Sequence, residues 1–176
     1  MPQLPPVTDA DHIRGDVNAP VVLVHYGDFE CPYSGAAYPV IKRAEELFEG
    51  DLCLVFRPFP LDDIHPHAMQ AALAAEAAGD KFWEMHDILF ENQDLLDFAD
   101  LFDYAQQIGL DPKTFEQTLR APATREAIQH SVASGKGIGV HGTPTFFING
   151  EFHDNREGLW KASHLMRLLE KARDSA

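Results

Sequence analysis

The chain has 176 residues, 45% of them hydrophobic and 24% charged, which is enough for one domain with a sizeable buried core. Its formal net charge is −14 at pH 7, and a surface this acidic repels both phosphate backbones and anionic membrane surfaces. We therefore expect neither nucleic acid nor a membrane among its partners.

The first sixteen residues carry no targeting signal. Three prolines fall within the first six positions, and no basic start is followed by an apolar core. No later run reaches the roughly 18 apolar residues of a membrane helix. We therefore expect a cytoplasmic protein, in which two cysteines, Cys31 and Cys53, are free or catalytic thiols more often than a structural disulfide.

Residues 19–59 predict a strand, a helix and a second strand. Four apolar residues at 21–24, three of them β-branched, precede Gly27 and suit a strand buried on both faces. Pro32 is typical of a first helical position, and apolar residues recur after it at helical spacing. Residues 51–59 then predict a second strand. A crossover of this length implies a βαβ unit with parallel strands.

Residues 62–139 predict helices only, whereas strand character returns at 143–153. The first of these helices is expected to begin at Pro66, with His65 as its cap. Asn149-Gly150 favours a two-residue turn between antiparallel strands, and an amphipathic helix closes the chain. The order βαβ, helical block, ββα predicts an α/β fold. We divide it into a core (17–61 and 140–176), a helical insertion (62–139) and an N-terminal extension (1–16).

Cys31 is the strongest candidate for a reactive residue. It follows the first strand and occupies the N-cap of the next helix, where the N–H groups of Tyr33 and Ser34 can point at the sulfur and the helix dipole favours a thiolate. Asp28 and Glu30 oppose a second negative charge. Because the helix acts at contact range, we expect its effect to dominate.

Several segments together resemble a known family. They are "GDVNAPVVLVHYGDFECPYS", "FRPFPL", "HPHAMQAALAAEAAG", "KFWEMHDILFE", "YAQQIGLD" and "GTPTFFING". In this order they resemble the DsbA-like branch of the thioredoxin-fold oxidoreductases, in the subgroup found fused to antiporters. The resemblance implies a thioredoxin fold with a βαβ–ββα core and an inserted all-helical subdomain. It also implies that the Thr143–Pro144 bond is cis and faces the thiol, and that the backbone of Thr143 pairs with the substrate.

The motif departs from the dithiol members of the family at Ser34, where they carry the resolving cysteine. A serine hydroxyl cannot displace a thiolate from a disulfide, although it can donate a hydrogen bond to Cys31. The chain is therefore expected to be a monothiol enzyme that reduces or isomerises protein disulfides, or removes glutathione adducts. An external thiol such as glutathione would complete the cycle as a co-substrate. We expect no other cofactor, and a monomer or weak homodimer.

Cys53 lies inside the second strand, more than about 10 Å from Cys31 along parallel strands. A disulfide needs Cα atoms within about 7 Å, so Cys53 is expected to be a core residue.

Two other functions remain open. One is a glutathione-dependent transferase or isomerase of the kappa type, although those relatives carry serine where this chain has Cys31. The other is a partner-binding module whose redox activity was lost with the second thiol. The rate at which Cys31 reacts with an alkylating agent at neutral pH would distinguish the binding module from an enzyme.

The remaining candidates lie near the thiol or among the histidines. Pro32, Tyr33 and Phe29 flank Cys31 and are expected to contact substrate, and His141 is a candidate partner or proton donor for the thiolate. Phe59 and Trp83 are expected in the core, and His86 is expected to be half-buried. His65 and His67 are two positions apart and would not share a helix face, so no metal site is predicted.

Overall fold

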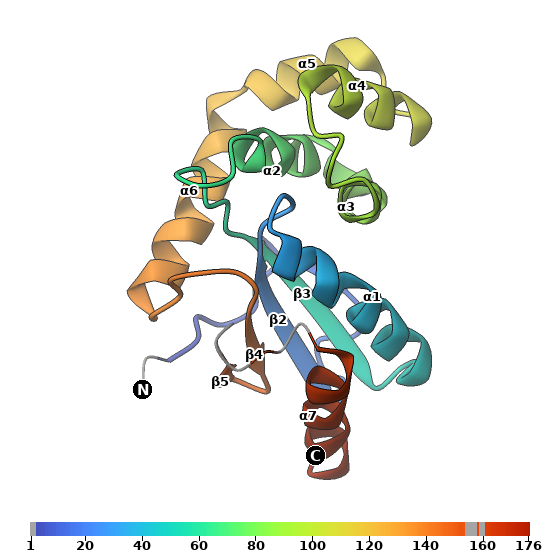
Figure 1. Cartoon of the computed structure of the whole chain (residues 1–176), viewed down its shortest axis with the longest axis vertical. Helices are drawn as coiled ribbons and strands as arrows, with labels where there is room; N and C mark the ends of the chain where they lie inside the picture. The colour runs from blue at the N-terminus through green and yellow to red at the C-terminus, as the bar shows by residue number, and fades with distance from the viewer. Residues whose placement is uncertain (1–2, 154–157, 159–160) are drawn as a thin grey trace.

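A computed structural model describes residues 3–153, 158 and 161–176. Its sheet has the strand order β1-β3-β2-β4-β5 (Figure 1). The strands are β1 (His12–Arg14), β2 (Val21–Gly27), β3 (Leu52–Pro58), β4 (Thr145–Ile148) and β5 (Glu151–His153). Strands β2 and β3 pair in parallel, whereas the other neighbours are antiparallel. The predicted α/β class and the parallel βαβ unit are confirmed.

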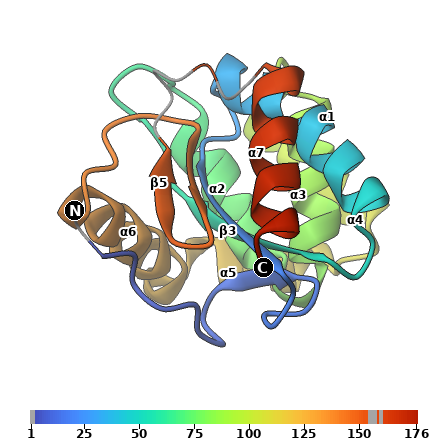
Figure 2. The same ribbon diagram turned by 90° about the horizontal axis from the view of Figure 1, so that it is seen from below.

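The two faces of the sheet are covered differently. Helices α1 (Pro32–Leu47) and α7 (Ala162–Asp174) pack on one face, as Figure 2 shows from below. The opposite face is covered by the N-terminal segment, by the C-terminal half of α6 (Pro122–Gly137) and by the residues that follow α6. Residues of β2 alternate between these two layers because successive side chains of a strand point to opposite faces.

Helices α2 to α6 lie between β3 and β4 in the chain; α2 to α5 form a separate layer, and α6 runs from that layer to the sheet (Figure 1). They are α2 (Ala68–Ala77), a short 3-10 turn (Gly79–Lys81), α3 (Phe82–Glu91), α4 (Phe98–Gln107), α5 (Pro112–Arg120) and α6. Their apolar faces share one core, to which the sheet contributes Phe56. Within the described part of the chain, no helix is both long and apolar enough to cross a bilayer.

Two local predictions meet different outcomes. The turn at Asn149 and Gly150 is confirmed, because both residues have positive φ and connect antiparallel β4 and β5. The predicted helix start at Pro66 is wrong, because α2 begins at Ala68. Hydrogen bonds to carboxylates of the Cys31 turn engage His65 and His67 instead, so neither side chain caps the helix.

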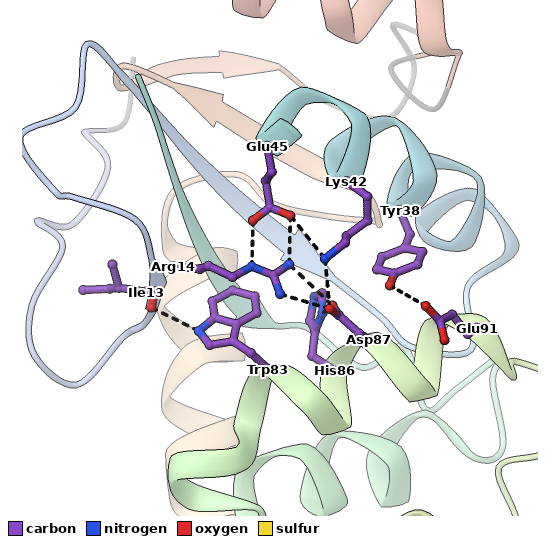
Figure 3. Close-up of polar contacts among 9 residues, drawn as sticks. All are labelled: Ile13, Arg14, Tyr38, Lys42, Glu45, Trp83, His86, Asp87 and Glu91. Atoms are coloured by element: carbon purple, nitrogen blue, oxygen red, sulfur yellow. Dashed lines mark hydrogen bonds and ion pairs between the residues drawn. The ribbon is translucent and has the colours of Figure 1, made fainter. Parts of the chain in front are cut away.

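Strand β1 was not expected from the sequence and lies in the predicted N-terminal extension. Arg14 of this strand is the centre of a polar cluster that connects it to α1 and α3 (Figure 3). The guanidinium donates to Glu45 at 2.6 Å and to Asp87 at 3.0 Å, and it lies 4.4 Å from the ring centroid of Trp83. The Trp83 indole N–H donates to the Ile13 carbonyl. These contacts explain why so short a strand is held at the sheet edge.

Candidate functional site

The candidate site lies where the parallel strands end. Cys31 follows β2, occupies the N-cap of α1 directly before Pro32, and is only 2% exposed. Its thiol donates a hydrogen bond to the Thr143 carbonyl, with 3.4 Å between sulfur and oxygen. The Thr143–Pro144 peptide bond is cis. Two segments 112 residues apart in the chain are thereby brought together at the sulfur.

The first turn of α1 does not cap the sulfur in the way the sequence suggested. The side chain of Cys31 accepts no capping hydrogen bond, because it points to the loop before Pro144. Ser34 is fully buried, and its hydroxyl accepts a 3.4 Å hydrogen bond from the Asp28 N–H rather than donating to Cys31. The N–H contacts to the sulfur that the sequence suggested are therefore not formed, and Ser34 does not use its capacity to donate to Cys31.

Asp28 organises the turn that carries Cys31. Its carboxylate is buried, and one oxygen accepts from the Leu61 N–H at 2.9 Å and from His65 Nδ1 at 2.7 Å. The other oxygen accepts from the Glu30 N–H at 2.8 Å. A buried carboxylate is tolerated when its oxygens are hydrogen-bonded in this way. Asp28 thus connects the turn to the chain that leaves β3.

Glu30 makes a second connection to the same segment. Its oxygens accept from the backbone N–H of His67 at 2.6 Å and from the His67 imidazole at 3.0 Å. The hydrogen bond to Glu30 raises the pKa of His67, and the neighbouring Asp97 acts in the same direction. His65 and His67 therefore hydrogen-bond to different carboxylates, those of Asp28 and Glu30. Among the residues that the structure describes, no group of three or more His, Cys, Asp or Glu side chains is arranged to hold a metal.

Gln93, which follows α3, contacts the turn from the helical layer. Its side-chain amide donates to the Phe29 carbonyl at 2.7 Å and to the Cys31 carbonyl at 2.9 Å. Gln93 was not expected at the site, because nothing in its neighbourhood in the sequence marks it as a partner of Cys31.

The flanking residues differ in exposure. Tyr33 is 50% exposed beside the thiol and remains a candidate for substrate contact. Phe29 is 1% exposed and packs in the core of the helical layer, so a surface role for its side chain is wrong. His141 is exposed and lines a hollow of about 330 Å³ with Leu61 and Lys136. Its role towards the thiolate stays a prediction.

Two buried histidines lie among the aromatic side chains near β2 and α3. Burial, and to a lesser extent the nearby His86, lowers the pKa of His25 to about 3. Burial also lowers the pKa of His86 to about 4, although a hydrogen bond to Asp87 opposes this. His86 is thus fully buried rather than half-buried. Both side chains are neutral at pH 7.

Cys53 is a core residue, as predicted. It is fully buried in β3 opposite Val22, and both cysteines are free. Burial raises the pKa of the Cys53 thiol, and Asp16 adds to the effect. Five strand residues at about 3.3 Å each separate Cys53 from the end of β3 next to the site.

Comparison with known proteins agrees with this architecture. A family model described as Thioredoxin matches residues 7–167. The chain belongs to the thioredoxin family. Among solved structures it is similar to a thioredoxin-like oxidoreductase from Silicibacter pomeroyi DSS-3, with a TM-score of 0.80, 23% identity and coverage of 96% of this chain and 95% of that one. It is also similar to oxidised BdbD from Bacillus subtilis, with a TM-score of 0.81, 22% identity and coverage of 98% and 97%. These matches confirm a thioredoxin fold.

The curated relatives of this thioredoxin-family chain are much longer. The Na(+)/H(+) antiporter NhaA 1 of Mycobacterium sp. (strain KMS) is 43% identical over 169 residues, which are 94% of this chain and 27% of that protein. The antiporter of the same name from Salinispora arenicola is 46% identical over 147 residues, which are 82% of this chain and 22% of that protein. The chain thus spans about a quarter of the relatives it matches, which agrees with the expected antiporter-associated subgroup.

Proposed function

We propose that the protein is a thiol–disulfide oxidoreductase that acts through Cys31 as its single nucleophile. The observation that carries this proposal is the placement of the Cys31 thiol at the start of α1, opposite the Thr143 carbonyl and without a second sulfur in the first helical turn. Family membership and the similarity to structures named as oxidoreductases support thiol–disulfide exchange as the general chemistry.

The first step is attack of the Cys31 thiolate on one sulfur of a disulfide. A new bond forms between Cys31 and that sulfur, the substrate S–S bond breaks, and the other sulfur leaves as a thiolate with the electron pair. The proton of the Cys31 thiol passes to solvent. The Thr143 carbonyl, which accepts from the thiol in the free protein, then becomes available to a backbone N–H of a bound peptide.

The second step requires a thiol from outside the protein. Ser34 cannot attack the mixed disulfide, and Cys53 is buried far along β3. If a peptide is joined to Cys31, a second thiol such as glutathione attacks the peptide sulfur. If glutathione is joined to Cys31, a second glutathione attacks the glutathione sulfur. In both cases Cys31 leaves as a thiolate. The proposed partners are therefore protein or glutathione disulfides, and a reducing compartment such as the cytoplasm would supply the thiol.

Tyr33, Pro32 and the backbone of Thr143 are the proposed substrate contacts. Tyr33 presents an exposed ring beside the sulfur, and Pro32 precedes it at the first helical position. His141 is proposed as a secondary contact, because its exposed side chain lies two residues before Thr143 in the loop that accepts from the thiol.

Reduction of a glutathionylated peptide tests the proposal. With glutathione and glutathione reductase, turnover is expected for the unmodified protein and for Cys53→Ala, whereas Cys31→Ser should be inactive. Mass spectrometry after incubation with oxidised glutathione should find one adduct, on Cys31. Absence of turnover together with slow alkylation of Cys31 would refute the enzyme and favour a partner-binding module. A Cys31–Cys53 disulfide would refute the monothiol mechanism.

A further inference from the structure

The Gln93 amide is a clamp on the backbone of the reactive turn. Its Nε2 atom carries two hydrogens and lies 2.7 Å from the Phe29 carbonyl oxygen and 2.9 Å from the Cys31 carbonyl oxygen. These carbonyls belong to the peptide groups directly before Glu30 and directly after Cys31. The Cys31 carbonyl is also the first acceptor of α1, because it receives the Gly35 N–H at 2.9 Å. One side chain thus sets the orientation of two peptide planes around the residue that bears the sulfur.

Gly35 makes room for this clamp. A Cβ atom placed on Gly35 would lie 1.9 Å from Oε1 of Gln93 and 2.5 Å from its Cδ. Any residue other than glycine at position 35 would therefore overlap the Gln93 amide where it now lies. The obstructing atoms are the end of a flexible side chain, so a Cβ would displace the amide without breaking the helix. Glycine after the Cys-Pro-Tyr-Ser motif and the distant Gln93 therefore form one unit.

We propose that Gln93, admitted by Gly35, is a positioning residue for disulfide exchange at Cys31. The attacking sulfur must approach along the axis of the disulfide, so its direction matters as much as its protonation. Orienting the Cys31 carbonyl sets the angle between the sulfur and α1. It thereby keeps the thiol beside the Thr143 carbonyl, where we place the substrate.

This inference rests on the proposed function, but it can be measured with a chemical probe alone. The probe is 4,4′-dithiodipyridine, and every protein carries Cys53→Ala so that only Cys31 reacts. The Cys31 thiolate attacks one sulfur, a Cys31–thiopyridine mixed disulfide forms, and thiopyridone is released with the electron pair. The second-order rate constant follows from the thiopyridone absorbance. Turnover of the glutathionylated peptide is measured separately.

Removing the donors is expected to slow the probe reaction. Gln93→Met keeps the length of the side chain without its N–H groups, and we expect a roughly tenfold lower rate constant for the loss of two neutral hydrogen bonds. Gly35→Ala should lower the rate to a similar extent, and adding it to Gln93→Ala should cause no further loss. The controls are Gln107→Ala, at an exposed position, and Gly137→Ala, whose Cβ would meet nothing within 4 Å. Both should react like the parent.

A pH profile separates positioning from a general loss of structure. In Gln93→Glu the carboxylate accepts but cannot donate, whereas its protonated form regains one O–H donor. The rate relative to the parent should therefore rise as the pH falls in Gln93→Glu and stay constant in Gln93→Met. Additive losses in the double variant, or parallel pH profiles for Glu and Met, would overturn the inference. If the parent does not turn over the glutathionylated peptide, the proposed function is refuted. The rate constants for 4,4′-dithiodipyridine would still test the role of Gln93.

Discussion

The buried imidazole of His25 predicts that the protein loses stability in mild acid. His25 is 1% exposed, contacts the rings of Phe56 and Phe146, and has a pKa lowered to about 3, first by burial and then by His86. In the unfolded chain its pKa returns to 6.5, the ordinary value of a histidine side chain. Below pH 6.5 the unfolded state therefore binds a proton that the folded state does not bind. The free energy of unfolding falls as the pH falls.

The size of the effect follows from the gap between the two pKa values. At pH 5, which is 1.5 units below the unfolded value, the unfolded state gains about 2 kcal/mol for His25. His86, with a folded pKa of about 4, adds a similar amount. The two residues together remove about 4 kcal/mol between pH 8 and pH 5. This is a large fraction of the roughly 5–15 kcal/mol that stabilises a typical domain.

The perturbation is His25→Leu, which removes the titrating group and fills a similar volume. Urea unfolding followed by Trp fluorescence at pH 8, 6.5 and 5 gives the free energy of unfolding of both proteins. We expect a difference within about 1 kcal/mol at pH 8, since the swap approximately conserves volume. At pH 5 the variant should have gained about 2 kcal/mol relative to the parent.

Other titrating groups cancel in this comparison. His67, whose pKa is raised by its hydrogen bond to Glu30, contributes stability at low pH that is lost as the pH rises, but it does so in both proteins. His86 is also present in both. A parallel decline in the stabilities of the parent and His25→Leu from pH 8 to pH 5 would refute a contribution of His25 to this loss.

Three further predictions concern the site and its supports. Ser34→Cys should supply the resolving thiol, so that protein disulfide turnover no longer needs an added monothiol; continued accumulation of the glutathione adduct in mass spectra would contradict this. Asp28→Ala should lower the free energy of unfolding in urea by about 2–4 kcal/mol, because the N–H groups of Leu61 and Glu30 and the His65 imidazole lose the buried carboxylate that accepts from them; a loss below about 0.5 kcal/mol would show that the carboxylate is not a support. Arg14→Ala should cost about 1–3 kcal/mol in the same assay and shift Trp83 fluorescence, because Asp87 loses a partner and the indole becomes more exposed; an unchanged spectrum would contradict the packing of β1.

The sequence predicted most of the elements and indicated Cys31 as the candidate thiol. The apolar run of β2, Pro32 after Cys31, and the turn at Asn149-Gly150 are local signals, because each depends on the conformational preferences of a few adjacent residues. Serine at position 34, where the dithiol relatives carry cysteine, is likewise visible in the sequence, and the proposed single-nucleophile mechanism rests on it.

The surroundings of the thiol required the tertiary structure. The sequence did not indicate that Asp28 and Glu30 pair with His65 and His67, that Gln93 contacts the Cys31 carbonyl, or that Phe29 turns into the core. These partners lie from 37 to 64 residues apart in the chain.

The physical reason for this division is the range of the interactions. Hydrophobic periodicity and turn chemistry specify which segments are helices and strands, since they act between neighbours in the sequence. Which carboxylate meets which imidazole depends on how the helical layer packs against the end of the sheet. That packing is decided by the summed burial of many apolar side chains, and the polar groups of the site pair within the geometry that it imposes.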